Sequence, residues 1–371
     1  MTTSDPGFSL PARTGVLIVG AGPAGLALAR QLRRRRIDHC IVDQDDAGAS
    51  WRSMPPALRL VSPWWTNALC WRDVFRHPPF ALVDAPQFAA YLDEFRTRED
   101  IRVVPGCKVT AIAAHGEGHV VTTSRGQVRS RFVVVCTGYF PHPVGPDPAA
   151  DDDGSIPVVH AAAYPGPEKV RRLAGGRPVI VVGRRVSAGQ IMVELADAGI
   201  EVALSTRAPV EFRRDGRLGA LKDALYYFYE ELLVVLRPRL RLPSFPVMDG
   251  GRSRELFEAG RIPRYPPIRA LREGVVEFED GSTLEAGMVV HATGYRPGLP
   301  ELPIDTDADG LPRCYDWEST RTPGVFFLGL DNRRNYRSRT LRGIRSDCRA
   351  LARTLQARID AAGGNSQPVE A

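Results

Sequence analysis

The sequence has little lysine, no paired cysteines and no long apolar run. Lysine occurs only at Lys108, Lys169 and Lys222, so the net charge of +6 rests on arginine. No basic run is interleaved with aromatic residues, which argues against a nucleic-acid surface. No uncharged stretch approaches the ~20 residues of a membrane-spanning helix, so we expect no transmembrane segment.

The six cysteines are widely spaced, and none forms a C-x-x-C pair. This spacing argues against a disulfide framework, a zinc site and a dithiol redox centre, and it fits a reducing cytoplasm. The N-terminal residues also lack the charged and apolar regions of a signal peptide. We therefore expect a cytoplasmic protein without a metal site. At 371 residues the chain exceeds one ordinary core, which predicts two domains or one domain interrupted by another.

The most informative stretch lies near the N-terminus. The β-branched and aliphatic run Val16–Val19 predicts a buried parallel strand, and it ends in the G-x-G-x-x-G sequence of residues 20–25. Gly20 permits a tight turn, Gly22 lets the backbone approach a pyrophosphate, and Gly25 allows the next helix to pack on the strand.

The turn continues through Pro23 and Ala24 into a helix predicted over residues 24–36, whose free N–H groups suit phosphates. The following strand, His39–Val42, ends in Asp43. This carboxylate lies about 20 residues past the glycines, where an acidic side chain takes the ribose hydroxyls of an adenine dinucleotide.

A second unit repeats the pattern. Strand Pro178–Val182, a turn beginning at Gly183, a helix and strand Glu201–Leu204 predict a second dinucleotide half-site. Moreover, the strand that runs into Thr-Gly-Tyr at residues 133–139 recurs before Tyr295. We expect an α/β fold of two Rossmann-like domains, one inserted in the other, with residues 1–140 and 295–371 forming the first domain and residues 141–294 the second.

These pieces resemble the class B flavoprotein monooxygenases, which include flavin-containing and Baeyer-Villiger monooxygenases. The similar segments span nearly the whole chain: GAGPAGL at 20–26, G-x-S-W-R at 48–52, residues 58–63 with Thr66 and Asn67, CTGY at 136–139, ATGYRP at 292–297, PGVFFLGL at 323–330 and Gly343-Ile344. The resemblance implies FAD in the first domain and NADPH in the second. In this family the reduced flavin reacts with molecular oxygen to give a C4a-peroxyflavin, which oxygenates a small-molecule substrate.

The resemblance also assigns residues. Asn67 matches a flavin-side asparagine and is the catalytic candidate; a plain turn residue is the alternative. Trp51 and Arg52 are expected to line the flavin, with a surface Trp-Arg stack as the alternative. Gly329 lies in a matching turn, and Gly343 and Ile344 are expected to aim backbone N–H groups at the flavin pyrimidine edge.

In the second domain Arg207 occupies the ribose-binding position, where an arginine favours the 2′-phosphate of NADPH, or else is a solvated surface residue. Ser187 matches the family, but the middle glycine of the loop is replaced by Arg185. Arg185 either blocks the nucleotide or grips its phosphate. If binding is lost, the protein is a substrate-reduced flavin oxidase or dehydrogenase, and a flavin-bound sensor is a third alternative.

Two further features stand apart from the nucleotide motifs. The family fingerprint F-x-G-x-x-x-H-x-x-x-F/Y is incomplete, so His160 is expected to be a hinge residue, and His291 a core histidine with its hydrogen bonds satisfied. The apolar helix predicted over residues 218–236 is expected to cover a substrate, a subunit or the core, and makes a homodimer possible. Its Glu230 and Glu231 argue against a membrane surface.

Overall fold

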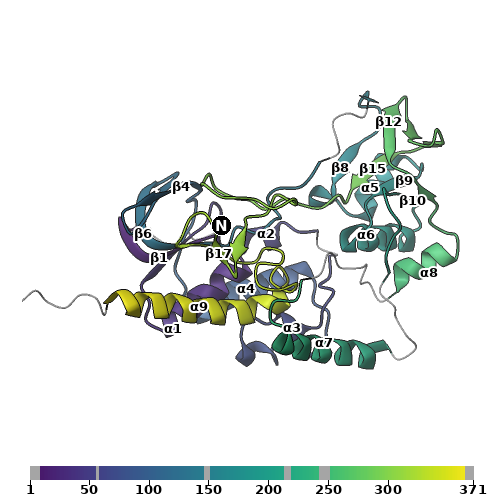
Figure 1. The fold of residues 1–371 in the computed structure, drawn as a ribbon. Coiled ribbons are helices and arrows are strands. Elements are labelled where there is room, and N and C mark those ends of the chain that lie inside the picture. Colours follow the sequence, from purple (N-terminus) through teal and green to yellow (C-terminus); the bar gives the residue numbers. More distant parts are fainter. Residues whose placement is uncertain (1–8, 56–57, 146–150, 213–218, 242–250, 364–371) are drawn as a thin grey trace, which may run out of the picture.

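The computed structural model describes residues 9–55, 58–145, 151–212, 219–241 and 251–363, and it forms two lobes (Figure 1). Among these residues the larger lobe holds a nine-stranded sheet. Its main path runs β16 (Cys314–Tyr315), β17 (Glu318–Ser319), β18 (Val325–Phe327), β6 (Gly126–Val135), β1 (Arg13–Val19), β2 (His39–Val42) and β3 (Val103–Val104), and an antiparallel meander adds β4 (Val109–His115) and β5 (Gly118–Thr123) to β6.

The smaller lobe has a parallel sheet of its own. Its order among the described residues is β11 (Arg264–Tyr265), β10 (Val202–Ser205), β9 (Val179–Val182), β15 (Met288–His291) and β8 (Val158–His160). A second, smaller sheet packs on one face of it, formed by β14 (Thr283–Glu285), β13 (Val275–Phe278), β12 (Ile268–Arg272) and β7 (Asp151–Asp152). The predicted α/β class with two Rossmann-like units is therefore confirmed. The exact domain limits at 140 and 294 stay a prediction.

The central strand of each parallel sheet pairs with its two neighbours in the same way. In the first, Val19 lies beside Val42 and Val135. In the second, Val182 lies beside Ser205 and His291. The strand ends that precede the two glycine turns therefore occupy equivalent places, and each turn continues at the carboxyl edge of its sheet, where open parallel sheets bind ligands.

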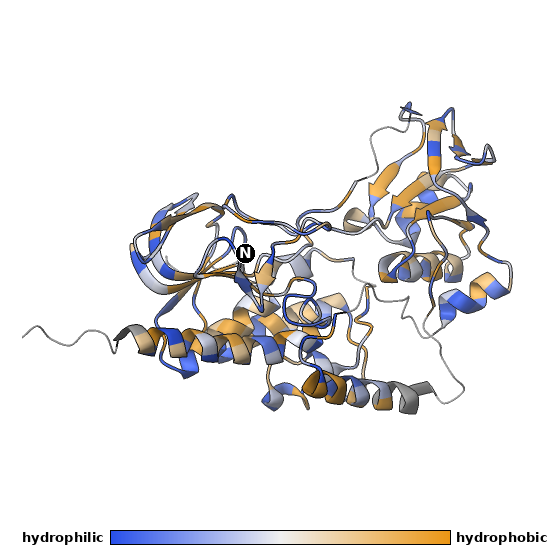
Figure 2. Cartoon of the chain, in the orientation of Figure 1, coloured by the Kyte–Doolittle hydropathy of each residue, from blue (hydrophilic) through white to orange (hydrophobic). Residues whose placement is uncertain are grey.

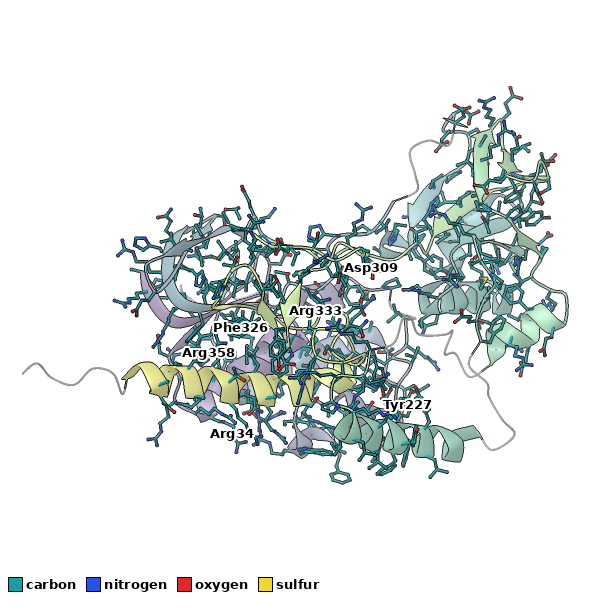
Figure 3. The ribbon with its side chains drawn as sticks, in the orientation of Figure 1. Arg34, Tyr227, Asp309, Phe326, Arg333 and Arg358 are labelled. Carbon is teal, nitrogen blue, oxygen red and sulfur yellow. The ribbon has the colours of Figure 1, made fainter. Side chains whose placement is uncertain are left out.

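Helices cover both sheets. In the larger lobe they are α1 (Pro23–Arg34), α2 (Ala49–Arg52), α3 (Trp64–Asn67), η1 (Trp71–Asp73), α4 (Ala85–Arg98) and α9 (Leu341–Gly363); in the smaller lobe they are η2 (Ala161–Ala163), α5 (Pro167–Ala174), α6 (Val186–Asp197) and α8 (Arg252–Glu258). Asp84 caps α4 and exchanges side-chain bonds with Gln87, as a capping box does. On the same face of the sheet, Arg358 of α9 lies over the ring of Phe326 in β18, 5.4 Å from its centroid (Figure 3).

The two chain crossings between the lobes run side by side. Val144 donates its N–H to Gly294 O at 2.9 Å, Arg296 to His142 O at 2.8 Å and Gly298 to Gly138 O at 3.1 Å. A Cβ atom on Gly298 would come within 2.4 to 2.5 Å of the exposed His142 ring, so that ring would have to move to admit a larger residue. The crossings thus form a short antiparallel ribbon rather than two independent linkers.

Helix α7 (Gly219–Leu236) belongs in sequence to the inserted unit but packs on the larger lobe, beneath α3 (Figure 1). Leu218 lies outside the described residues. Glu230, 2% exposed, accepts bonds from Arg342 Nε at 2.7 Å and Nη2 at 2.9 Å. Glu231 accepts from Arg337 Nη1 at 2.6 Å, and Tyr227 donates its hydroxyl to Val61 O at 3.0 Å. Two buried guanidinium groups of the larger lobe are therefore neutralised by one helix of the insertion.

Glu230→Gln should destabilise the protein by about 3–5 kcal/mol, because it removes the carboxylate from a buried ion pair and leaves the charge of Arg342 behind. Urea unfolding followed by circular dichroism measures the loss. Glu258→Gln is the matched control, since the Arg254–Glu258 pair on α8 is exposed and such pairs contribute about 1 kcal/mol or less. Equal, small effects of both substitutions would show that the buried pair does not hold α7.

Candidate functional site

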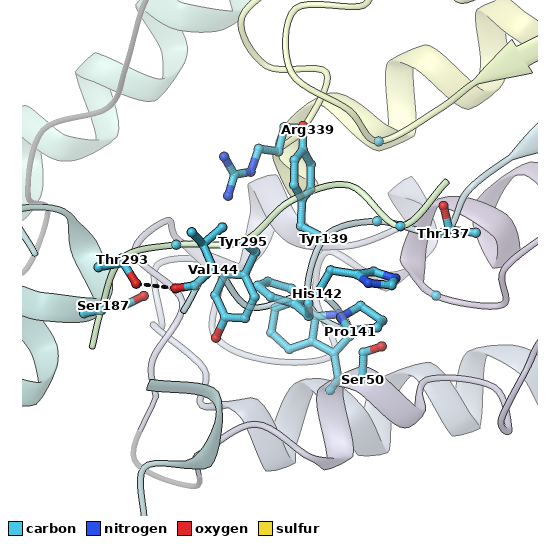
Figure 4. A pocket seen from close by; sticks show the side chains of 18 of the residues that line it. Ser50, Thr137, Tyr139, Pro141, His142, Val144, Ser187, Thr293, Tyr295 and Arg339 are labelled. Atoms are coloured by element: carbon cyan, nitrogen blue, oxygen red, sulfur yellow. Dashed lines mark hydrogen bonds between the residues drawn. The ribbon is translucent and has the colours of Figure 1, made fainter. Parts of the chain in front are cut away.

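A large cavity lies between the two lobes of the described structure and has a volume of about 1720 Å³. It is lined by both glycine turns, by both chain crossings and by the first residues of α9. Figure 4 shows the crossings within it, with the Thr293 hydroxyl donating to Val144 O. Since a pocket for one drug-sized ligand has about 300–1,000 Å³, this cavity has room for more than one small molecule.

The first glycine turn has the geometry that its sequence predicts. Gly20 has a φ of +106°, and a Cβ there would lie 2.6 Å from Cys136 O, so only glycine fits. A Cβ on Gly25 would collide with the carbonyl of Gly20. Gly22 differs: it is the N-cap of α1, its φ is −77°, and a Cβ on it would meet no atom within 4 Å. Together with Pro23 and Ala24 it faces the cavity.

Asp43 lines the cavity just after β2. Its Oδ2 accepts the N–H of Ala21 at 2.6 Å, and its Oδ1 accepts the N–H of Asp45 at 2.9 Å. Burial raises the pKa of Asp43, while the two N–H groups oppose that shift. The carboxylate is thus fixed beside the glycine turn with lone pairs left for hydroxyl donors.

An aromatic wall closes one side of the cavity. Trp51 packs against Phe88 and meets the edge of Phe140 at 5.9 Å, and Phe140 meets Tyr295 at 5.2 Å. Arg52 is not among the lining residues. Its guanidinium instead contacts Asp93 at 3.0 Å and Ala47 O at 2.7 Å, so the structure places Trp51 and Arg52 on different sides of α2.

Asn67 is fully buried at the end of α3 and is also part of the cavity lining. Its Oδ1 accepts the Ser62 hydroxyl at 2.8 Å, and its Nδ2 donates to Ser62 O at 2.7 Å. The amide orientation is therefore fixed by one neighbouring residue. A second hydrogen on Nδ2 is left for a ligand.

The second glycine turn copies the first in its backbone. Gly183 has a φ of +149°, and a Cβ there would lie 2.5 Å from Ala292 O. Arg185 is the N-cap of α6 with φ −114° and ψ −168°, close to the extended conformation of Gly22. Arg185 and Ser187 both line the cavity, and Arg185 is exposed to it. The arginine is thus accommodated without backbone strain.

Three guanidinium groups surround this turn: those of Arg184, Arg185 and Arg207. Arg184 reaches Pro209 O at 3.5 Å and Glu211 at 3.9 Å. In the described part of the chain no hydrogen bond or ion pair involves the side chains of Arg185 or Arg207. This end of the cavity is consequently positive and suits an anion.

The prediction that Gly343 and Ile344 aim N–H groups into the cavity is wrong. Both donate to Thr340 O, at 2.9 and 3.2 Å, because α9 begins at Leu341 and Thr340 is its N-cap. Leu341 and Arg342, the first two residues of α9, line the cavity instead. A Cβ on Gly343 would instead collide with Arg337 O.

Beside this helix start lies a cluster that the sequence did not reveal. Tyr139 donates its hydroxyl to Asp331 at 3.0 Å, and Arg339 contacts the same carboxylate at 3.1 Å while its guanidinium lies 4.3 Å from the Tyr139 ring centroid (Figure 4). Burial and the charge of Asp331 raise the pKa of Tyr139. The repeated Thr-Gly-Tyr turn was the one signal that could have indicated it. Gly329, at φ +81°, packs beside Ala24 at the same edge.

The two histidines of the inserted sheet have different roles. His160 accepts from the N–H of Ala162 at 3.0 Å and lies 3.1 Å from Gly294 O, so it ties the sheet to the crossing, in line with a hinge position. His291 is 5% exposed, as predicted for a core histidine, but its Nδ1 has no hydrogen-bond partner among the described residues, so its hydrogen bonds are not satisfied there as predicted. Burial lowers the pKa of His291 to about 4.

The described residues offer neither a reactive thiol pair nor a metal site. All six cysteines are free, and burial raises the pKa of Cys136, which lines the cavity, so its reactive thiolate is disfavoured. Among the described residues no group of His, Cys, Asp and Glu could hold a metal ion. Within the same residues no helix is both long and apolar enough to cross a membrane.

The chain is similar to known proteins in both sequence and structure. The family model described as "Pyridine nucleotide-disulphide oxidoreductase" matches residues 17–221, which is more than half of the chain. An uncharacterized CzcO-like oxidoreductase of Geobacillus kaustophilus is 26% identical, over 91% of this chain and 96% of that protein. The probable indole-3-pyruvate monooxygenase YUCCA3 of Arabidopsis thaliana is 28% identical, over 81% and 78%. A flavin-containing monooxygenase structure from Stenotrophomonas maltophilia has a TM-score of 0.74 at 23% identity, covering 94% of this chain and 100% of that one.

Proposed function

The chain belongs to the pyridine nucleotide-disulphide oxidoreductase family, and from this premise we propose that it is an FAD-dependent monooxygenase that uses NADPH to oxygenate a small organic molecule. One observation supports the proposal above the others: two equivalent glycine turns, from two parallel sheets, open into a single cavity. Hydride transfer requires the nicotinamide and flavin rings to meet in one cavity, and this arrangement provides such a cavity.

The first turn fits FAD. The empty space beyond the Cα of Gly22 allows a pyrophosphate to approach the N-terminus of α1, and Asp43 has lone pairs for ribose hydroxyls. The N-terminal end of α9, whose first residue Leu341 lines the cavity, suits the polar edge of the ring system. When bound, the flavin supplies the two-electron chemistry and the reaction with oxygen.

The side chains around that ring would exclude water, contact the substrate and donate a hydrogen bond. The wall of Trp51, Phe140 and Tyr295 excludes water and offers flat apolar surfaces to an aromatic substrate. Asn67, held by Ser62, presents a fixed amide donor. The cavity thiols take no part in this proposal, because no dithiol pair exists in the sequence.

The second turn fits NADPH through its guanidinium groups. Arg185 lies at the N-cap of α6 where a pyrophosphate belongs, and Arg207 follows β10 where a ribose 2′-phosphate belongs. Their lack of partners within the described residues supports a role in binding an anion.

Arg207→Ala should weaken NADPH binding about tenfold and leave NADH binding unchanged, because the lost charge-assisted hydrogen bonds involve only the 2′-phosphate. Calorimetric titration of the flavin-loaded protein with each nucleotide measures both constants. Arg254→Ala, an exposed arginine on α8, is the matched control. An equal loss for both nucleotides would assign Arg207 a structural role instead.

The reaction itself is tested by mixing the flavin-loaded protein with NADPH without oxygen. We expect loss of the flavin absorbance at about 450 nm within seconds to minutes, then its return with NADPH consumption when oxygen and substrate are added. Persistent colour would contradict the proposal. It would favour the substrate-reduced oxidase, for which the specific observation is the arginine at position 185 in place of glycine.

A further inference from the structure

The outward side of α7 is apolar along its described length. Its side chains there are 54% to 76% exposed and recur at helical spacing, so they form one stripe, called here the α7 outer face: Leu225, Phe228, Tyr229, Leu232, Val235 and Leu236. Figure 2 shows apolar colouring along this helix. A stripe of this kind on a surface helix normally faces a core, whereas here it faces solvent.

The stripe continues onto the segment after α3. Phe228 stacks on Trp65 at 5.2 Å, and Arg345 joins Trp65 to Trp71, donating to Trp65 O and lying 3.9 Å from the Trp71 ring centroid. Trp71, Phe75 and Phe80 are 57%, 83% and 58% exposed. Summed with the α7 outer face, these side chains expose roughly 1,000 Å² of apolar surface; the largest single patch on a typical monomer has ~300–600 Å².

The charges around the patch are those of arginines. Glu230 and Glu231, the acidic residues of this part of α7, turn inward to Arg342 and Arg337, so the α7 outer face itself carries no charge. At its C-terminal end follow Arg237, Arg239 and Arg241, all exposed, and Arg72 and Arg76 lie beside the exposed aromatics. Arg72, Arg76 and Arg239 pair with Glu99, Glu94 and Asp316, whose side chains are 14%, 56% and 31% exposed. Glu94 is the most exposed of these three carboxylates, and pairs exposed to water contribute little.

We propose that the α7 outer face, with Trp71, Phe75 and Phe80, docks the protein on the surface of an anionic lipid bilayer. Aromatic and aliphatic side chains would enter the boundary between headgroups and acyl chains, and the arginines would contact lipid phosphates. Contact of this type lies in the plane of the membrane and requires no spanning helix.

Charge favours a bilayer over a second copy of the chain. In a symmetric pair with parallel α7 helices, the Arg237–Arg241 segments would face each other. In an antiparallel pair each segment would face the positive N-terminal end of the partner helix. Both arrangements oppose like charges, whereas lipid phosphates neutralise them.

The test is flotation of the flavin-loaded full chain with vesicles of phosphatidylcholine alone or mixed with phosphatidylglycerol. We expect binding to the mixed vesicles that falls as salt is raised, and at least about tenfold weaker binding to neutral ones. Leu232→Glu and Val235→Glu should each weaken binding to the mixed vesicles about tenfold. Because both residues are exposed, the variants should keep their flavin absorbance and unfolding midpoint.

Leu173→Glu is the matched control, an exposed leucine of α5 in the other lobe, and should bind like the unchanged protein. Failure of the unchanged protein to float with the mixed vesicles overturns the proposal. So does a dimer in light scattering that Leu232→Glu dissociates, since that result would assign the face to a second copy. NADPH oxidation without vesicles reports the proposed function separately and does not depend on either outcome.

Discussion

Gly22→Asp should yield a folded protein that binds no flavin. The aspartate Cβ enters space that is empty in the structure, and the φ of −77° is open to any residue, so folding has no reason to suffer. The carboxylate would however lie where a pyrophosphate must approach the N-terminus of α1, and two anions would meet in a site built for one. We expect flavin affinity to fall by at least about 100-fold.

The measurement is flavin content after purification and after reconstitution, read as absorbance at about 450 nm. Gly22→Ala is the matched control, because it adds bulk without charge and should retain part of the flavin. Circular dichroism and the unfolding midpoint of the flavin-free proteins should be equal for both. A yellow, stoichiometrically loaded Gly22→Asp protein would exclude the first glycine turn as the flavin site.

Arg185→Glu should abolish measurable NADPH binding, and Arg185→Gly should weaken it about 10- to 100-fold. Of the two interpretations that the sequence left open for Arg185, the geometry favours phosphate binding over an obstacle. The backbone at Arg185 is as extended as at Gly22, so the loop is not distorted, and the side chain has no described partner that would hold it across the site. A guanidinium so placed can contact a phosphate in place of the N–H contacts that glycine would allow.

Titration with NADPH, followed by flavin reduction without oxygen, measures the effect. Arg184→Glu is the matched control, since its guanidinium reaches Pro209 O and Glu211 and should matter less. Tighter binding in Arg185→Gly would show that the arginine is an obstacle. The flavin spectrum of all three variants should match that of the unchanged protein, because the first turn is untouched.

Local sequence patterns predicted the glycine turns well, because strand, turn and helix are set by residues near one another. Gly20 and Gly183 each have a positive φ, and each approaches the carbonyl of the residue just before a Thr-Gly-Tyr turn, so both the repeat and its spacing carried the information. The N-cap of α4 at Asp84 was predictable for the same reason.

Other predictions failed where distant residues decide. α9 begins at Leu341, and the N–H groups of Gly343 and Ile344 in its first turn donate to Thr340 O instead of facing the cavity. Arg52 leaves the cavity because Asp93, 41 residues away in sequence, attracts it. The sequence of α7 is apolar on nearly every side, so it could not predict that Glu230 points into the protein. Its partner, Arg342, follows 112 residues later in the chain.

The attachment of α7 has an evolutionary and practical consequence. Helix α7 lies within the inserted domain in sequence, yet it supplies the carboxylates that neutralise Arg337 and Arg342 of the larger lobe. The inserted domain therefore cannot be removed or exchanged without destabilising the larger lobe. A chimaera joined at the two crossings would carry away Glu230 and Glu231 and leave two buried cations in the recipient. Viable graft boundaries must therefore exclude residues 219–241 from the transplanted piece, or move α9 with it.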